Sequence, residues 1–280
     1  MNIKITSDST CDLSQELIDQ FDITILPLTV VKDDQAYTDG VTITTDEIFA
    51  HVAAGGNLCS TTAASVGEYQ DMFAKFADKY DAIVHINISA EFSACHQNAR
   101  LAASEFDNVL VIDSRNLSTG QGLVVLKACE IAKATSSLEE IGDILRDYTS
   151  KVEASFLLDR LDYMVKGGRC SMVAALGANL LNLKPCIEVK DGKMAVVKKY
   201  RGKYSKCLAE YVKDRLANRD DLQRHTLFVT RTPVDDTCLN AVKAAVDEHA
   251  DFETIYWTKA GCTISCHCGP GTLGVLFVRK

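Results

Sequence analysis

The sequence contains no apolar run that approaches the roughly 18–20 residues of a membrane-spanning helix. Its opening residues, MNIKITSDST, lack the apolar region of a secretory signal peptide and enter a strand pattern directly. We therefore expect a cytoplasmic protein with no stable membrane insertion.

The common motifs of nucleotide and hydrolase sites are also missing. There is no G-x-x-x-x-G-K-[ST] loop, and the G-Q-G at 120–122 lacks the third glycine of a dinucleotide-binding fingerprint. Neither H-E-x-x-H nor G-x-S-x-G occurs. These absences leave an enzyme possible in principle, but they remove the common routes to nucleotide, zinc-protease and hydrolase chemistry.

The composition is that of an ordinary globular protein. The 280 residues are 47% hydrophobic, which suits one large or two medium domains with a core that could hold a ligand. A net charge of −8 gives no electrostatic reason to expect nucleic acid or an anionic membrane as a partner. The dense basic run at 198–206 is interpreted as a solvated surface segment. Eleven cysteines without a secretion signal indicate reduced thiols, most of them small core residues.

Strand and helix patterns alternate in the first half of the chain. We expect strands at 2–6, 23–31, 82–89 and 109–114, and helices at 67–80, 93–106 and from 123 onward. The alternation predicts βαβ units and a parallel sheet with helices on both faces. Pro27 lies within the second strand run and favours an edge or a bulge there.

The pattern changes in the second half. A helix at 137–152, opened by Ser137-x-x-Glu140, marks the join between domains 1–152 and 153–280. Asp191-Gly192 between two extended runs predicts a hairpin with a type I′ turn. Further strands are expected at 226–231, 253–257 and 274–279. The predicted fold is α/β in two domains: an N-terminal three-layer α/β/α domain with a parallel sheet, and a C-terminal domain with a mixed sheet.

Small hydroxyl residues follow several of the expected strands. They stand at 7–10, 89–93 and 114, and the CSTTAAS stretch at 59–65 adds others in front of a helix. Ligands of open α/β sheets bind at the carboxyl ends of the strands, and helix N-termini there attract anions. Each residue alone is interpreted as a cap or turn residue. Together they favour a shared anion site.

The stretch ISCHCGPGTLGVLF at 264–277 contains Cys266-His267-Cys268, which suggests a metal site. A structural zinc site needs a second closely spaced ligand pair, and none is found. Adjacent residues of an extended chain also point to opposite sides. A metal- or redox-dependent enzyme built on this cluster stays the alternative hypothesis. The turn Gly269-Pro270-Gly271 favours a ligand-positioning role for His267, beside a purely structural one.

The segment 167–189, GGRCSMVAALGANLLNLKPCIEV, mixes small residues with leucine and methionine. It is interpreted as a core helix, or as one wall of a lipophilic tunnel.

Several short motifs occur in a specific order along essentially the whole chain, about 3–279. They are SDSTCDL at the start, TTAAS at 61–65, ISAEFSACHQNA at 88–99, VIDSRNLSTGQG at 111–122, GGR at 167–169, LLNLKP at 180–185 and HCGPGTLG at 267–274. The ordered set resembles the DegV family of bacterial fatty-acid-binding proteins.

The resemblance implies a two-domain α/β protein that holds one long-chain fatty acid, such as palmitate, and needs no metal or other cofactor. Some family members present the lipid to the separate kinase subunit of a fatty acid kinase. Carried over by motif, the carboxylate-binding hydroxyls are Thr61 or Thr62 and Ser93, with His267 and Arg169 in the surrounding polar network. The fold also resembles a domain of dihydroxyacetone kinases, but the missing nucleotide loop argues against an ATP-using kinase.

The motifs depart from the family pattern in two places. Where the family usually has T-S-Q-P-S, this chain has Thr62-Ala63-Ala64 in the middle of the motif. Where Gly-Thr usually follows the serine at 93, Ala94-Cys95 stands instead. Both changes keep a hydroxyl group at position 62 and at Ser93, so the proposed anchor is retained.

Overall fold

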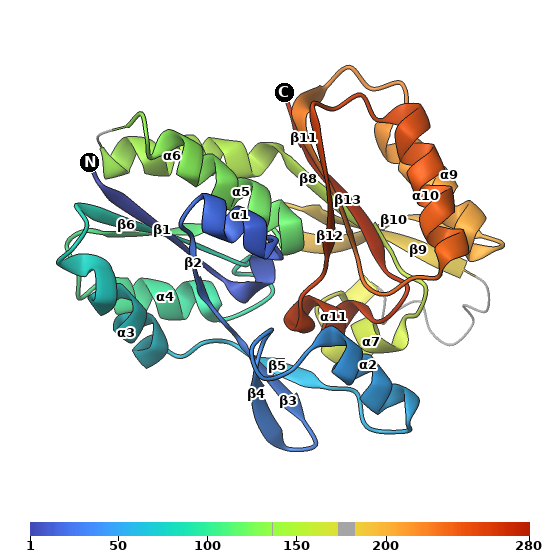
Figure 1. Cartoon of the computed structure of the whole chain (residues 1–280), viewed down its shortest axis with the longest axis horizontal. Helices are drawn as coiled ribbons and strands as arrows, with labels where there is room; N and C mark the ends of the chain where they lie inside the picture. The colour runs from blue at the N-terminus through green and yellow to red at the C-terminus, as the bar shows by residue number, and fades with distance from the viewer. Residues whose placement is uncertain (136, 173–182) are drawn as a thin grey trace.

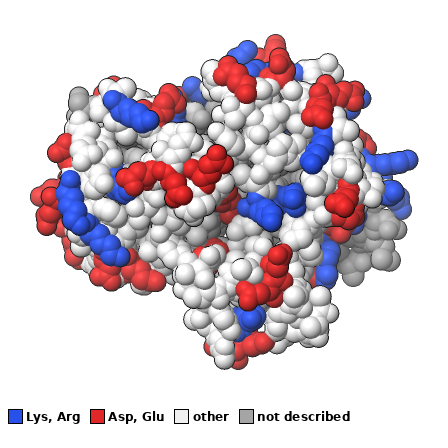
Figure 2. Space-filling model, in the orientation of Figure 1, with Lys and Arg blue, Asp and Glu red and all other residues white. Residues whose placement is uncertain are grey.

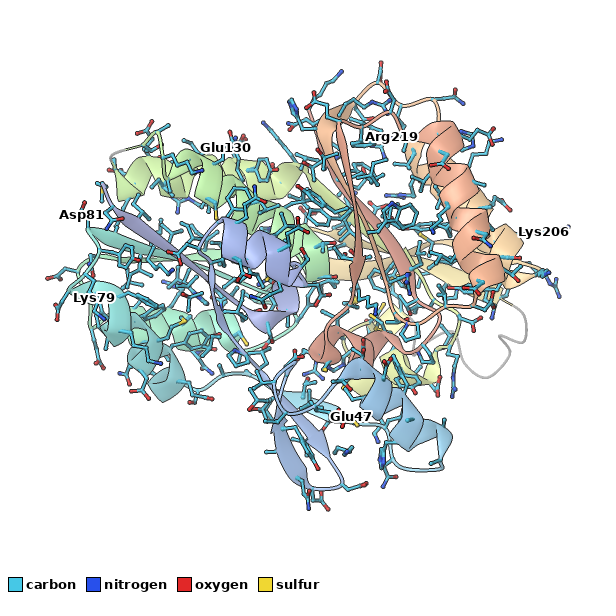
Figure 3. All side chains as sticks on the ribbon, in the orientation of Figure 1. Glu47, Lys79, Asp81, Glu130, Lys206 and Arg219 are labelled. Carbon is cyan, nitrogen blue, oxygen red and sulfur yellow. The ribbon has the colours of Figure 1, made fainter. Side chains whose placement is uncertain are left out.

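The computed structural model describes residues 1–135, 137–172 and 183–280, and Figure 1 shows it as two large sheets with a smaller one below them. The central part of the expected tunnel wall, residues 173–182, lies outside the described residues. No helix within the described residues is long and apolar enough to cross a membrane. The face in Figure 2 mixes basic and acidic side chains. The charged side chains of Lys79, Asp81 and Lys206 project from the periphery (Figure 3).

The first sheet is parallel throughout and has the strand order β2-β1-β6-β7. Its strands are β1 (Ile3–Asp8), β2 (Thr24–Leu26), β6 (Ala82–Asn87) and β7 (Val109–Asp113). The helices on one face are α3 (Val66–Ala77) and α4 (Cys95–Ala103), and those on the other are α1 (Gln15–Gln20), α5 (Ser118–Ile131) and α6 (Leu138–Lys151) (Figure 1). The predicted three-layer arrangement is confirmed.

Two of the expected helix starts agree with the structure in detail. Ser65 stands three residues before Glu68, a spacing in the sequence that predicts a capping box ahead of the helix at 67–80. In the structure Ser65 is the N-cap of α3 and forms this capping box with Glu68. Ser137 is the N-cap of α6, and its hydroxyl accepts a hydrogen bond from the backbone N–H of Glu140.

The strand expected at 23–31 is in fact two strands that belong to different sheets. The chain leaves the parallel sheet after β2, and β3 (Thr29–Lys32) pairs with β4 (Gln35–Thr38) and β5 (Ser60–Thr62) in a small antiparallel sheet. Pro27 lies at the break, where its missing N–H and fixed φ prevent a continuous ladder. The sequence analysis did not predict this small sheet, nor the helix α2 (Thr45–Ala53) that follows it.

The second large sheet is mixed, as predicted, and has the order β10-β9-β8-β13-β11-β12. Its strands are β8 (Val152–Leu157), β9 (Leu183–Lys190), β10 (Lys193–Arg201), β11 (Leu222–Arg231), β12 (Thr254–Lys259) and β13 (Leu273–Arg279). Figure 1 shows α9 (Tyr204–Leu216) and α10 (Asp236–His249) beside it. The basic run at 198–206 forms the end of β10 and the start of α9. Asp191 and Gly192 have φ values of 52° and 79°, which confirms the predicted type I′ turn.

Helix α5 lies between the two large sheets and contacts both. Eleven of its 14 residues are buried and Glu130 near its end is exposed, which explains why its sequence has no wide polar face. The largest apolar cluster contains Ile5 and Ile86 from the first sheet together with Phe228 and Leu276 from the second. The two halves of the chain therefore share one core.

Helices α7 (Asp162–Gly167) and α11 (Cys262–Cys268) lie together under the second sheet, next to α2 (Figure 1). The extended chain expected around Cys266 and His267 is wrong, because both residues lie in α11. The helix ends at the Gly-Pro-Gly turn, where Gly269 has φ 75° and ψ 172°. Only glycine adopts that conformation readily.

All eleven cysteines lie within the described part of the chain, and all are buried. None of them is joined in a disulfide there. They pack as small apolar side chains, as the sequence analysis expected.

We predict that Gly269→Ala lowers the free energy of unfolding by at least about 1–3 kcal/mol, because the backbone conformation is closed to alanine. The new Cβ would also lie 2.7 Å from Cδ2 of Tyr163. Urea denaturation measures the change. Gly67→Ala is the matched control, because its Cβ meets nothing within 4 Å on helix α3. It should leave stability unchanged or raise it by up to about 1 kcal/mol. Equal losses in the two variants would contradict this account of the turn.

Candidate functional site

The five residues proposed from the sequence line the same cavity. It has a volume of about 50 Å³ and is bounded by β5, β10, α11, the end of α7 and the chain before α4 and α5. The residues are Thr61, Thr62, Ser93, Arg169 and His267. They come from segments up to 206 positions apart, so the fold brings them together.

Thr61 and His267 form the central polar contact of the cavity. Thr61 lies in β5 opposite Val30 of β3, and its Oγ1 is 2.8 Å from Nε2 of His267 on α11. Thr62, the next residue of the strand, is exposed. The structure therefore pairs Thr61 with the histidine and places Thr62 nearer to solvent.

The imidazole of His267 is half-buried and uncharged at neutral pH. Burial lowers its pKa to about 4, and the positive charge of Arg169 acts in the same direction. Its Nδ1 is buried without a hydrogen-bond partner among the described residues. A Cβ at position 167 would lie 2.4 Å from this nitrogen, so Gly167 gives the ring its space. If Nε2–H donates to Thr61 Oγ1, the hydroxyl hydrogen of Thr61 is free to donate to a ligand.

Arg169 supplies the positive charge at the rim of the cavity. Its guanidinium donates to the backbone carbonyls of Phe92 at 3.3 Å and Gly167 at 2.5 Å, and its side chain is exposed. No aspartate or glutamate occurs among the described residues that line the cavity. An anion therefore meets one cation and several neutral dipoles there.

Ser93 combines a structural role with a place in the cavity wall. Its Oγ accepts a hydrogen bond from the backbone N–H of Cys95 at 3.2 Å and lies 3.1 Å from the Cys95 sulfur. This is the turn expected ahead of a helix, here α4. The hydroxyl is only partly buried, and it also borders the cavity.

Thr263 is a lining residue that the sequence analysis missed. Its Oγ1 is buried and has no hydrogen-bond partner among the described residues. In a helix, residues four positions apart share a face, so Thr263 and His267 both point toward the cavity. The same spacing would have identified Thr263, had the segment been recognised as a helix.

The N-terminus of α11 is held by two aspartates from distant parts of the sequence. Asp39 accepts hydrogen bonds from the backbone N–H groups of Cys262 at 2.9 Å and Thr263 at 3.2 Å. Asp12 accepts one from Gly261 at 2.8 Å. Both side chains satisfy N–H groups that lack a partner within the helix. Burial raises the pKa of Asp12 to about 8, so at neutral pH its charge contributes little to the match with the helix dipole. These contacts fix the helix that carries His267.

A second, apolar cavity continues from the first into the core. It measures about 30 Å³ and shares Leu117, Ile264 and Cys268 with the first cavity. Phe156 and Leu276 of the second sheet border it farther in. The cavity at Thr61 and the apolar cavity between the two sheets therefore adjoin each other at these three side chains.

The Cys266-His267-Cys268 cluster does not converge on one point. Cys266 packs with Cys59 and Cys262 in a small apolar cluster, while Cys268 belongs to the main core. His267 turns toward Thr61. Across residues 1–135, 137–172 and 183–280, no group of three or more His, Cys, Asp or Glu side chains could hold a metal ion. The geometry does not favour the metal-site alternative.

We predict that His267 titrates near pH 4, which an NMR titration of its ring signals measures directly. Because the unfolded chain takes up this proton at about pH 6.5, acidification from 6.5 to 4 favours unfolding. This group lowers the free energy of unfolding by about 1.4 kcal/mol for each pH unit of acidification in that range. His267→Gln should remove that part of the pH dependence. Titration of the folded protein near 6.5 would contradict the half-buried, neutral state.

Comparisons with known proteins point in one direction. The family model described as "Uncharacterised protein, DegV family" matches residues 2–280. A DegV domain-containing protein of Clostridium acetobutylicum is 33% identical over 99% of this chain and 99% of its own length. Another, from Caldanaerobacter subterraneus, is 31% identical with the same coverage.

Solved structures of similar proteins share the whole fold. A fatty-acid-binding DegV family protein from Thermus thermophilus gives a TM-score of 0.92 at 28% identity, with 100% of both chains covered. A stearic-acid-binding protein from Eubacterium ventriosum gives 0.82 at 28% identity, with 99% and 98% covered. DegV of Bacillus subtilis, also described as a fatty-acid-binding protein, gives 0.82 at 26% identity with 100% of both chains covered.

Proposed function

Because this chain belongs to the DegV family, we propose that it binds one long-chain fatty acid, such as palmitate, with the carboxylate at the Thr61–His267 pair. The observation that carries the proposal is a cavity lined both by hydroxyl groups with Arg169 and by apolar side chains, next to a second, apolar cavity. The similar proteins from Thermus thermophilus and Eubacterium ventriosum are described as binding fatty acids.

Hydroxyl groups donate hydrogen bonds to the carboxylate, and the exposed guanidinium of Arg169 attracts its negative charge. In this proposal His267 orients the hydroxyl of Thr61, while Ser93, Thr62 and Thr263 supply further hydroxyl groups around the head group. A hydrogen bond to a charged group contributes about 1.5–3 kcal/mol. The donors therefore set the position and direction of the fatty acid.

The hydrocarbon tail supplies most of the affinity. At about 0.8 kcal/mol per buried methylene, a sixteen-carbon chain contributes roughly 10 kcal/mol before the costs of ordering it. The two cavities have volumes of about 50 and 30 Å³, which are smaller than the roughly 300–1,000 Å³ of typical ligand pockets. We therefore expect the side chains at their junction, Leu117 and Ile264, to rotate when the tail enters.

The position of the head group suggests what the bound lipid is for. Thr62 and Arg169 are exposed, so the carboxylate end of the cavity is the end nearest to solvent. A separate kinase subunit could there transfer the γ-phosphoryl group of ATP to a carboxylate oxygen, giving an acyl phosphate and ADP. We propose that this chain acts in the cytoplasm as the non-catalytic, lipid-presenting subunit of such a pair.

The first test is lipid mass spectrometry of an extract of the purified protein. We expect about one long-chain fatty acid per chain. An empty extract, together with no binding of palmitate or oleate by the delipidated protein, would overturn the proposed function.

The second test separates the head-group contacts from the tail. The delipidated protein should bind palmitate at least about tenfold more tightly than hexadecanol, which has the same chain without the charge. Thr61→Val combined with Ser93→Ala should remove most of that preference and leave hexadecanol binding nearly unchanged. Titration calorimetry measures both affinities.

Thr237→Val combined with Ser104→Ala is the matched control. Both residues are exposed and lie on α10 and at the end of α4, outside the cavity wall. The control should keep the wild-type preference for palmitate. A preference that survives in the Thr61 and Ser93 variant would show that these hydroxyls do not bind the carboxylate.

A further inference from the structure

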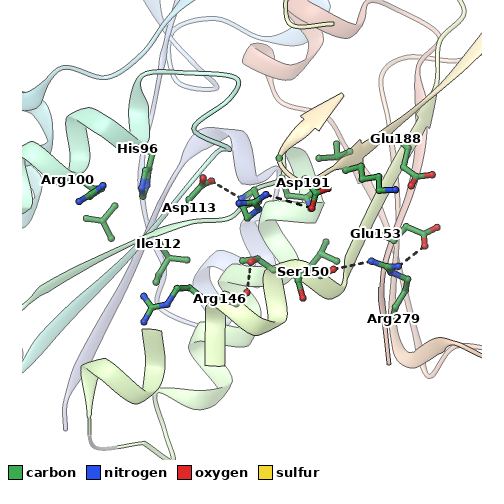
Figure 4. Close-up of a pocket in the computed structure, with 18 residues that line it drawn as sticks. His96, Arg100, Ile112, Asp113, Arg146, Ser150, Glu153, Glu188, Asp191 and Arg279 are labelled. Carbon is green, nitrogen blue, oxygen red and sulfur yellow. Dashed lines mark hydrogen bonds and ion pairs between the residues drawn. The ribbon is translucent and has the colours of Figure 1, made fainter. Parts of the chain in front are cut away.

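A third cavity, larger than the two described above, lies on another part of the molecule, beside the edge strand β7. Its volume is about 760 Å³, and Figure 4 shows it between α4, α6 and the β9–β10 hairpin. Among the described residues, none lines both this cavity and the candidate fatty-acid cavity. Asn116 faces the larger cavity and the next residue, Leu117, faces the other one. The two sites are therefore separated by the chain between β7 and α5.

The tip of the hairpin closes one side of this cavity by reaching across to the first sheet. Ser89 donates a hydrogen bond to the carbonyl of Gly192 at 2.8 Å, and a Cβ on Gly192 would lie 2.9 Å from that hydroxyl oxygen. Arg115 and Asp191 form an ion pair at 3.9 Å across the same junction. The cavity is thus built by both halves of the chain.

Arginine side chains from two helices border one end of the cavity. Arg100 comes from α4 and Arg146 from α6, and in Figure 4 they lie on opposite sides of Ile112 of β7. Within the described ranges, Arg100 forms no ion pair and Arg146 pairs only with Asp143, one turn earlier on the same exposed helix face. Such surface pairs are weak. This end of the cavity therefore retains positive charge.

The carboxylates at the opposite end are already neutralised. Glu153 pairs with Arg215, Arg219 and Arg279, and Glu188 pairs with Arg215 at 2.8 Å. These groups form a closed ionic network in the wall at the start of β8 and the end of β9. They leave the charge of the arginine end uncancelled.

Asp113 and His96 lie between the two ends. One oxygen of Asp113 accepts hydrogen bonds from the backbone N–H groups of Ala90 at 3.2 Å and Arg115 at 2.8 Å. Its other oxygen can accept from a ligand hydroxyl group. The Nδ1 atom of His96 is buried without a partner among the described residues. Polar groups able to bind a hydroxylated molecule therefore stand next to the arginine end.

Part of the remaining wall is apolar, although Asn116, Thr149 and Ser150 also line it. Val111 and Ile112 of β7 face the cavity together with Val152 and Val189 of the second sheet. Such a surface accommodates the apolar face of a sugar ring or a base. The cavity volume lies within the roughly 300–1,000 Å³ of sites for small organic ligands.

We propose that this cavity binds a small phosphate ester that carries hydroxyl groups, with the phosphate between Arg100 and Arg146 and a hydroxyl on Asp113. Guanidinium groups bind phosphate through paired, charge-assisted hydrogen bonds. The exposed Lys190 on the hairpin adds a further cation near the entrance. Glu153 and Glu188 are paired with arginines in the wall, so they have little effect on which ligand binds. The preference for an anionic ligand therefore comes from Arg100 and Arg146.

The test is an NMR titration of the full chain with two matched probe pairs: ribose 5-phosphate against ribose, and AMP against adenosine. At least one phosphorylated probe should shift the backbone amides of 111–116 and the side-chain Nε signals of Arg100 and Arg146. Its counterpart without phosphate should bind at least about tenfold more weakly. Absence of such shifts with both phosphorylated probes at millimolar concentration would overturn the proposal.

A double variant, Arg100→Gln with Arg146→Gln, tests the assigned contacts. It should weaken binding of the phosphorylated probe about tenfold or more and leave palmitate binding unchanged. Arg201→Gln with Lys206→Gln removes the same charge from exposed residues outside the cavity and should keep probe binding. Equal weakening in both double variants would show that only net charge matters, and undiminished binding in the first would place the phosphate elsewhere. Either result would overturn the proposal.

Discussion

The hydrogen bond between Thr61 and His267 depends on a short helix whose two ends are fixed by groups far away in the sequence. Asp39 and Asp12 bind the free N–H groups at the start of α11. At its other end, Gly269 takes a backbone conformation reserved for glycine and packs against Tyr163. Because both ends of α11 are fixed, the orientation of the His267 side chain toward Thr61 is fixed as well. The polar end of the cavity is therefore preformed by the fold.

Burial of the imidazole determines how an anion would be attracted. Because His267 is neutral at pH 7, the electrostatic attraction must come from Arg169 and from hydroxyl dipoles. Neutral donors cost less to desolvate than a buried cation, and they leave a carboxylate able to react with an incoming group. In the proposed complex, the apolar cavity beyond Leu117 supplies most of the binding energy, which suits a ligand with one small charged end and a long tail.

Sequence patterns predicted the parts of the fold that depend on local periodicity and turn chemistry. The parallel sheet, the Asp191-Gly192 turn and the caps at Ser65 and Ser137 belong to this group. The small antiparallel sheet was missed because Pro27 was interpreted as an edge or a bulge within one strand. Its three strands are short, and β5 pairs with β3 across an intervening helix.

The candidate site shows the same division. Thr61, Thr62, Ser93, Arg169 and His267 were proposed from ordered motifs, and the fold places all of them around one cavity. Their role toward a carboxylate remains a prediction. Thr263 escaped notice because α11 has only seven residues, too few for a clear helical period. Asp39 could not be found from sequence, since its contacts with α11 join residues 223 and 224 positions apart.

A crystal structure of the protein grown with palmitate would locate both ends of the bound lipid. We expect the carboxylate within hydrogen-bond distance of Thr61 Oγ1, with the tail passing Leu117 and Ile264 toward Phe156. Rotation of those two side chains should join the two small cavities into one channel. A fatty acid bound outside this path, or one that enters with its methyl end at His267, would contradict this binding mode.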